Sequence, residues 1–186
     1  MTDEQLLLDR MMHRLRTSLA VISGYSELGM TRDDAELKAE ARVAVATAVA
    51  DLSNGIDEVM LALELSWHPG AGTLGSVDVR QAVADAVART ARVEATVEPG
   101  AEVTALADHE TVVRALQALL RAAGPGPCRV TLGVVGSRAR VAIESSRPIA
   151  VDDERLALKN AHRLAELLDG AVSVDDARLE LELPAG

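Results

Sequence analysis

The sequence is poor in aromatic residues and in cysteine. Among its 186 residues there are one Trp, one Tyr and no Phe, and Cys128 is the only cysteine. A single cysteine excludes an internal disulfide and is compatible with a reducing compartment. No zinc-binding cluster can be proposed, and we expect Cys128 to be a small buried apolar residue of a strand. Without large rings, the core must consist of Leu, Val, Ala and Ile, which favours helices.

Positive charge is also scarce. Lys and Arg number 19 against 29 Asp and Glu, which gives a formal net charge of −10. This balance argues against nucleic acid or an anionic membrane as the main partner, and favours a protein. No apolar run approaches about 18 residues, and the amino-terminal MTDEQLLLDR has acids where a signal peptide would have bases. We therefore expect a cytoplasmic protein.

Two long helical patterns occupy the first third of the chain. One runs without proline from Thr2 to about Met30, and the other begins near Asp33 or Asp34, where acids suit a helix start. Apolar residues recur at alternating spacings of 4 and 3, the seam of a helical bundle. The first stripe is Leu8, Met12, Leu15, Leu19 and Ile22, and the second is Val45, Val49, Leu52, Ile56, Val59 and Leu63.

A hairpin of two such helices leaves part of both stripes uncovered, because each apolar face is wider than a single partner can bury. A second copy of the chain is the simplest cover. We therefore predict that residues 1–67 form an antiparallel helical hairpin that pairs with its twin into a dimeric four-helix bundle.

A linker is predicted at residues 68–76, where Pro69 and three glycines interrupt the helical periodicity. Residues 77–186 then alternate helices with a mostly antiparallel sheet, so the fold class is α+β. The predicted elements are a helix within 77–92, a strand at 93–99, a helix capped by Asp108, two strands around a turn at Gly136 and Ser137, a helix at 153–170 and a final hairpin over 171–184.

His13 lies beside the seam of the first helix. At about 100° per residue, Thr17 falls roughly 40° round the helix from His13, and Arg16 is adjacent. A largely uncharged imidazole at the wet edge of a bundle can act as a nucleophile near neutral pH. The alternative is that His13 is a solvated helix residue without a chemical role.

The strings HRLRTSL (13–19) and AVISGYSEL (20–28) resemble the H-box of bacterial sensor histidine kinases. The resemblance implies a dimerisation and histidine-phosphotransfer hairpin with His13 as phospho-acceptor. It further implies that Thr17 positions a water for dephosphorylation, and Arg16 is placed to contact acceptor oxygens or a receiver carboxylate. Arg14 replaces the acid that serves the family as general base for attack on ATP, and Ser18 replaces its usual proline.

Residues 77–186 resemble a GHKL-type (Bergerat-type) ATP-binding domain that has lost its motifs. Arg121 replaces the metal-holding asparagine of the N-box, and a guanidinium offers Mg²⁺ no oxygen ligand. The adenine-binding D-x-G-x-G falls on Glu144 to Pro148 without its glycines, and the phosphate-binding G-x-G-x falls on Arg155 to Leu158. About seven residues join Ser146 to Asp153, too few for a nucleotide lid. We predict a degenerate domain without nucleotide.

The remaining polar candidates are given structural roles. Acids at helix starts explain Asp108 with Glu110, and likewise the run Asp152, Asp153 and Glu154. His109 and His162 are expected on the surface, and His68 beside Trp67 is expected to end the second helix. No metal site and no serine or cysteine triad is proposed.

The sequence thus predicts a homodimeric histidine phosphotransferase of a bacterial phosphorelay. Phosphate would pass through His13 between aspartates of response-regulator receiver domains, with Arg16 and Thr17 as its neighbours. No cofactor would be bound by this chain, and Mg²⁺ would belong to the receiver. One alternative is a non-catalytic pseudokinase that binds and regulates a response regulator or a sensor kinase. A third interpretation is a truncated but active sensor kinase. It would require ATP binding, and the motifs argue against such binding.

Overall fold

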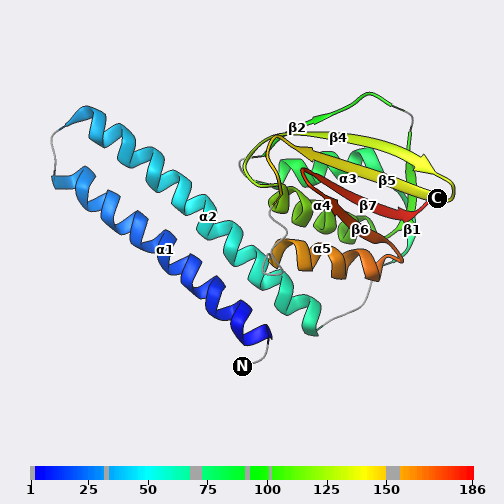
Figure 1. The fold of residues 1–186 in the computed structure, drawn as a ribbon, viewed down its shortest axis with the longest axis horizontal. Helices are drawn as coiled ribbons and strands as arrows, with labels where there is room; N and C mark the ends of the chain where they lie inside the picture. The colour runs from blue at the N-terminus through cyan, green and yellow to red at the C-terminus, as the bar shows by residue number, and fades with distance from the viewer. Residues whose placement is uncertain (1–2, 32–33, 68–72, 91–92, 101, 150–155) are drawn as a thin grey trace. The chain divides into compact units, whose positions relative to one another are not determined.

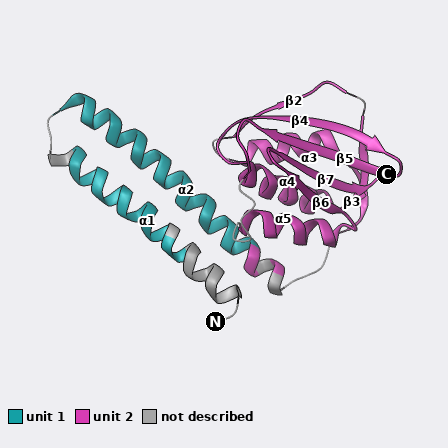
Figure 2. Ribbon diagram, in the orientation of Figure 1, with its two compact units in different colours: residues 1–61 teal, residues 62–186 magenta. Residues whose placement is uncertain are grey.

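The computed structural model describes residues 3–31, 34–67, 73–90, 93–100, 102–149 and 156–186 (Figure 1). Its contacts divide the chain into two compact units, residues 1–61 and 62–186 (Figure 2). The first unit holds the helical pair, and the second contains helices and β-strands. The predicted α+β class, a helical hairpin followed by an α/β domain, is confirmed. The domain boundary that we placed after residue 67 stays a prediction.

Helices α1 (Asp3–Thr31) and α2 (Ala35–Trp67) form the antiparallel hairpin, with bounds close to those predicted. Asp34 caps α2, since its Oδ1 accepts from the backbone N–H of Glu36 at 2.9 Å and of Leu37 at 3.3 Å. Three of the buried residues of α2 are small and recur every seven residues: Ala41, Ala48 and Gly55. The helices approach closely at Ala41, where a Cβ built on Gly29 of α1 would lie 3.8 Å from the Ala41 Cβ.

Each helix buries only one edge of its apolar stripe. In α1, Leu15 and Ile22 are half-buried, whereas Met12 and Leu19 remain 47% and 50% exposed. In α2 the alternation is the same, with Val45, Leu52 and Val59 half-buried and Val49 and Ile56 nearly half exposed. The side chain of Leu8, also assigned to the stripe, lies outside the described residues. The hairpin therefore presents an apolar face that its own two helices do not cover.

The second unit contains a five-stranded sheet in the order β2-β4-β5-β7-β6 and a two-stranded sheet of β1 and β3. All pairings are antiparallel except β2 with β4, which is parallel. The strands are β1 (Gly75–Asp78), β2 (Val93–Val97), β3 (Thr104–Ala107), β4 (Gly126–Val135), β5 (Arg138–Ser145), β6 (Ala171–Asp175) and β7 (Arg178–Pro184). The helices are α3 (Val79–Ala88), α4 (His109–Ala123) and α5 (Leu156–Leu167).

The helices of this unit cover one face of the larger sheet, and the other face is open (Figure 1). Leu179, Leu181 and Leu183 of β7 alternate toward the helices and are fully buried. Their partners in register, Ile143, Val141 and Ala139 of β5, are buried on the same side. Arginines and glutamates occupy most of the intervening positions, which also include Ala142 and Pro184. Arg140 and Glu182 pair at 2.7 Å across the open face, and Arg178 and Glu180 at 2.6 Å.

The small sheet of β1 and β3 was missed by the sequence analysis. Gly75 and Ser76, which we assigned to the linker, belong to β1 and pair with Ala107 and Leu106 of β3. Glycine, serine and alanine predict strands poorly, and each of these strands is only four residues long. Their pairing depends on partners distant in sequence, which periodicity cannot supply. The rest of the predicted linker, residues 68–72, lies outside the described residues.

Asp residues cap two helices of this unit, α3 and α4. The predicted cap Asp108 accepts from Thr111 N–H at 2.9 Å and from its hydroxyl at 2.6 Å. Asp78, which we had not singled out, caps α3 by accepting from the N–H groups of Arg80 and Gln81. Within the described residues, no helix is both long and apolar enough to cross a membrane.

Gly170 provides a test of the core. Its N–H donates to Ala165 O at 2.8 Å beyond the end of α5, where the chain turns into β6. A Cβ on Gly170 would clash with the backbone oxygen of Glu182 and would lie 3.0 Å from Leu183 Cδ2. We expect Gly170→Ala to lower the free energy of unfolding by about 1–3 kcal/mol, because backbone must move to admit the methyl group.

Urea unfolding followed by circular dichroism measures this effect. Gly133→Ala is the matched control, because a Cβ there would meet no atom within 4 Å. Its stability should stay within about 0.5 kcal/mol of wild type or rise slightly. Equal losses in the two variants would contradict the packing described for Gly170.

Candidate functional site on the helical hairpin

His13 lies on the exposed side of α1. The half-buried residues of this helix, among them Leu15, Ile22 and Gly29, define the side that faces α2. At about 100° per residue, His13 points roughly 160° away from the centre of that side. Its imidazole is therefore open to solvent and to a protein that approaches the outer surface of the hairpin.

Arg16 and Thr17 are also exposed on α1. The Thr17 hydroxyl donates a hydrogen bond of 3.0 Å to the backbone carbonyl oxygen of His13, one helical turn earlier. This bond fixes the Thr17 side chain on the same flank as His13 and leaves the lone pairs of its oxygen available as acceptors. The side chain of Arg14 lies outside the described residues.

The side chains of strand β5 alternate between the two faces of the sheet, and this alternation fixes the direction of the last ones. Because successive residues of a strand face opposite sides, Ile143 faces the helices and Glu144 faces the open side. There Glu144 lies 3.5 Å from Arg178 of β7. We had assigned Glu144 to the adenine-binding position of an ATP-binding domain. A carboxylate that binds adenine between the sheet and the helices must project from the helix-covered face of the sheet. Glu144 projects from the open face instead.

The side chain that does face the helices at this point is Ser145. Its hydroxyl donates to the backbone oxygen of Ala123 at the end of α4, at 3.2 Å. The Ser145 hydroxyl oxygen in turn accepts a hydrogen bond from the backbone N–H of Arg147 at 3.2 Å. Ser145 thus joins the end of β5 to the end of α4, which is a structural role. A hydroxyl at this position does not supply the ionised acceptor of an aspartate.

The other residues that we aligned with nucleotide-binding motifs also have structural roles. Arg121 is half-buried in the last turn of α4, where a cation is favoured by the helix dipole. Leu156, Ala157 and Leu158, at the glycine-rich position, are buried in the first turn of α5. Their side chains fill space that a phosphate would need in order to reach backbone N–H groups. Arg155 lies outside the described residues.

The remaining histidines and acids do not form a reaction centre within the described residues. His109 is partly exposed as predicted, but its Nε2 lies 3.1 Å from Asp85 Oδ2 in α3, a contact that sequence could not show. Hydrogen bonds from Gln81 and then from His109 lower the pKa of Asp85. Glu110 accepts from Arg89 at 2.9 Å and 3.0 Å, which also ties α4 to α3.

His162 is exposed on α5, as expected. Cys128 is buried in β4, also as expected, and burial raises the pKa of its thiol. His68, Asp152, Asp153 and Glu154 lie outside the described residues. In the part of the chain that is described, no three His, Cys, Asp or Glu side chains gather closely enough to hold a metal ion.

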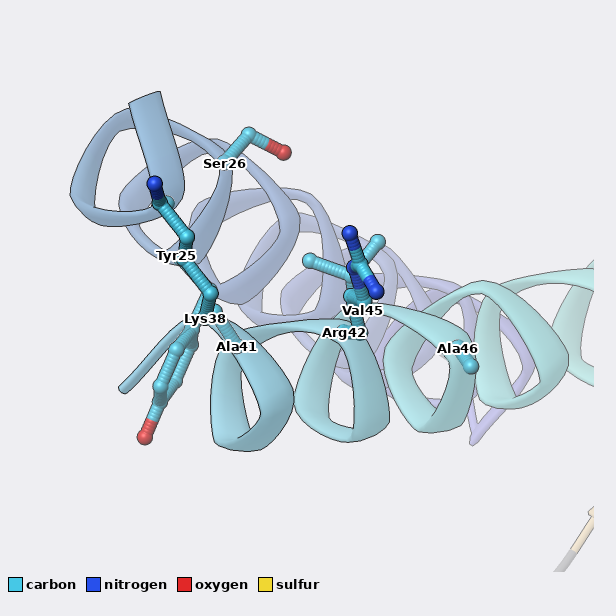
Figure 3. Close-up of a pocket in the computed structure, with 8 residues that line it drawn as sticks. Tyr25, Ser26, Lys38, Ala41, Arg42, Val45 and Ala46 are labelled. Carbon is cyan, nitrogen blue, oxygen red and sulfur yellow. The ribbon is translucent and has the colours of Figure 1, made fainter. Parts of the chain in front are cut away.

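An open hollow of about 550 Å³ lies between α1 and α2 near the turn of the hairpin (Figure 3). Tyr25, Ser26 and Gly29 line it from α1. Lys38, Ala41, Arg42, Val45 and Ala46 line it from α2. Sequence reasoning did not find this hollow, because it depends on the pairing of small residues across the hairpin.

Solved structures of histidine kinases match the chain, whereas no protein-family model and no curated protein does. The Acinetobacter baumannii histidine kinase AdeS matches 92% of this chain over 97% of its own, with 18% identity and a TM-score of 0.59. The chain has a histidine kinase-like fold. At this identity the likeness establishes the fold alone.

Two longer structures support the same assignment. The histidine kinase ThkA, solved in complex with the response regulator protein TrrA, matches 96% of this chain with 16% identity and a TM-score of 0.66. Full-length ShkA in complex with AMPPNP matches the whole chain with 18% identity and a TM-score of 0.55. This chain spans only 61% of the matched ThkA chain and 46% of the ShkA chain.

The orientation of Glu144 and the filling of the phosphate position by α5 lead to a prediction about nucleotide. We expect that millimolar ATP with Mg²⁺ leaves the melting temperature unchanged and gives no calorimetric signal. A ligand at a hundredfold excess over its Kd stabilises a protein by about 2.7 kcal/mol, which a melting curve would register.

Arg121→Asn is an informative second sample for this experiment. It restores the N-box side chain but leaves Glu144 on the open face, so it too should show no response to ATP. A clear ATP-dependent rise in the melting temperature of wild type would contradict the prediction and revive the active-kinase interpretation.

Proposed function

We propose that this protein is a histidine phosphotransferase that carries phosphate on His13 between the aspartates of response-regulator receiver domains, without ATP. The observation that carries the proposal is the exposure of His13, Arg16 and Thr17 together on the outer side of α1. The histidine kinase-like fold supports it, and so does the solved complex of ThkA with the response regulator TrrA.

The transfer needs only the imidazole and a receiver. The ring nitrogen of His13 that carries no hydrogen attacks the phosphorus of an aspartyl phosphate. A nitrogen–phosphorus bond forms, the bond from phosphorus to the carboxyl oxygen breaks, and the receiver regains its carboxylate. The second transfer reverses these steps on another receiver. Because an acyl phosphate is a high-energy donor, the neutral imidazole requires no general base, and Arg14 is compatible with the reaction.

Arg16 and Thr17 have supporting roles in this proposal. Arg16 is exposed and makes no ion pair within the described part of the chain, so its guanidinium is available to phosphoryl oxygens or to a receiver carboxylate. The Thr17 oxygen can accept a hydrogen bond from a water beside His13 while its own hydrogen remains on the His13 carbonyl. Such a water would hydrolyse the phosphohistidine or the docked aspartyl phosphate.

Mg²⁺ enters through the receiver and not through this chain. Phosphoryl transfer to or from an aspartate uses a divalent cation held by the receiver's own acidic pocket. We expect no Mg²⁺ to enter with a nucleotide bound to this chain. The side chains at the expected nucleotide-binding positions support this, since Glu144 pairs with Arg178 and Leu156 to Leu158 are buried.

The proposal includes a homodimer. The apolar face formed by Met12, Leu19, Val49 and Ile56 is exposed in the single chain, and helix geometry places the four side chains on one side of the hairpin. Burial of a leucine side chain contributes about 1.5–3 kcal/mol of favourable free energy. A second copy that covers this face would therefore stabilise the dimer through several such side chains. A four-helix bundle is the simplest closed arrangement of two such hairpins.

His13→Gln tests the transferase. The change removes the nucleophile but keeps polarity and a good helix former at an exposed position. We expect the variant to stay folded and dimeric, to bind receiver, and to accept no phosphate from a phosphorylated receiver. Acid-labile, base-stable label on the purified chain is the measurement.

His68→Gln, His109→Gln and His162→Gln are matched controls and should each accept phosphate as wild type does. The non-catalytic scaffold predicts a different pair of results: wild type takes up no label, and receiver binding is the same in wild type and His13→Gln. That pair would end the phosphotransferase proposal in favour of the scaffold.

Leu19→Glu tests the dimer. Wild type should show twice the chain mass of 19.6 kDa by light scattering at micromolar concentration. Placing a carboxylate in the seam leaves an uncompensated buried charge that costs several kcal/mol, so the variant should be monomeric.

Leu28→Glu is the matched control. Leu28 is 39% exposed on the same helix, but it faces away from the apolar stripe. The Leu28→Glu variant should remain dimeric, although it carries the same added charge as Leu19→Glu. A monomeric wild type, or two monomeric variants, would remove the four-helix bundle from the proposal.

A further inference from the structure

The larger sheet of the second unit ends at a strand with which no described segment pairs on its outer side. Strand β6 pairs with β7 alone, and Figure 1 shows it at the margin of the sheet, beside α5. An outermost strand exposes backbone N–H and C=O groups, which proteins usually protect with lysine, proline or a bulge. β6 has the sequence AVSVD and pairs with β7 at every residue, so it has none of these devices.

The turn between β6 and β7 determines which backbone groups of β6 are free. Asp175 and Arg178 flank this two-residue turn and are opposite each other in the ladder, so they form a hydrogen-bonded pair. Bonded and non-bonded pairs alternate along an antiparallel ladder. Val172 and Val174 therefore direct their N–H and C=O groups away from β7, and each supplies a free donor and a free acceptor at the edge.

The side chains of β6 offer a different surface on each face of the sheet. Val172 and Val174 are half-buried on the helix-covered face, in register with leucines of β7. The other three residues of the strand are exposed on the open face: Ala171, Ser173 and Asp175. A strand that continues the sheet would therefore place apolar side chains beside the valines and polar side chains on the open face.

The surroundings of this edge are acidic. Between Arg163 and Arg178 the sequence contains no lysine or arginine, and it contains four acids: Glu166, Asp169, Asp175 and Asp176. Asp175 and Asp176 are exposed and make no ion pair within the described residues. Arg178, which is opposite Asp175 in the ladder, pairs instead with glutamates of β5 and β7. Charge complementarity at this edge therefore favours a basic partner.

Other arrangements are less favourable. Antiparallel pairing of β6 with a second copy of itself would bring the aspartates at both ends of the two strands into one short ladder, where like charges oppose pairing. The opposite edge of the sheet, β2, is better protected. Pro99 follows β2, and Arg80 donates hydrogen bonds to the backbone oxygens of Glu98 and Gly100 there.

We propose that β6 is an interaction edge that accepts, as a further strand of the sheet, an extended partner segment in which basic and apolar residues alternate. The backbone groups of Val172 and Val174 bond the segment, and its apolar side chains lie beside the two valines. Its lysines or arginines pair with Asp175 and Asp176 on the open face. In this kind of recognition the backbone bonds supply affinity and the alternate side chains supply specificity. The inference does not involve His13 and is independent of phosphate transfer.

Hydrogen exchange followed by NMR tests the pairing. The probe is the synthetic peptide KVKVKVK, titrated against the full-length chain. We expect saturating peptide to slow exchange of the Val172 and Val174 amides, which face solvent in the free chain. The amides of Ser173 and Asp175 already bond β7 and should change little. The proposal is overturned if the two valine amides are already protected in the free chain, or if saturating peptide leaves their exchange unchanged.

Asp175→Asn combined with Asp176→Asn tests the charge. Asparagine tolerates the positive φ of Asp176, so the turn should be retained. The Kd of the peptide should rise about fivefold, as expected for the loss of two exposed ion pairs. Glu94→Gln combined with Glu102→Gln is the matched control, because it removes the same charge at exposed residues, one of them on β2. It should bind peptide as wild type does, and equal losses in the two double variants would contradict the proposal.

N-methylated peptides separate strand pairing from attraction by charge alone. Methyl groups on the valine nitrogens block the hydrogen bonds of a peptide that docks antiparallel to β6, and methyl groups on the lysine nitrogens block those of a parallel one. One of these two isomers should therefore lose binding while the other keeps it, although both carry the same charge. Equal affinity of the two isomers would mean that no strand is added, and the proposal would be withdrawn.

Discussion

The packing of α1 against α2 determines which side chains of the hairpin are exposed. Ala41, Ala48 and Gly55 of α2 are small, buried and recur every seven residues. Leu15 and Ile22 of α1 are half-buried on the side that faces α2. This orientation turns His13 outward, fixes Thr17 on its flank, and leaves Met12 and Leu19 along one side. Exposure of the candidate nucleophile and exposure of the apolar face thus have a single cause.

Sequence patterns predicted the helices well and predicted side-chain direction in the sheet poorly. Heptad spacing located α1 and α2, and turn residues located the β4–β5 and β6–β7 hairpins, because these signals are local. The pairing of β1 with β3 depends on contacts between distant residues of weak β propensity, and it was missed. In the alignment to the nucleotide motif, a shift of one residue in β5 separates Glu144 from Ser145. In a strand, one residue reverses the face on which a side chain lies.

In the second unit, the side chains at the end of β5 and at the start of α5 have structural partners. Glu144 pairs with Arg178 beside a ladder of arginine and glutamate on the open face. Ser145 joins β5 to α4, and Leu156 to Leu158 complete the core beneath α5. Each of these interactions stabilises the domain. Replacement of one of these residues would therefore oppose existing packing.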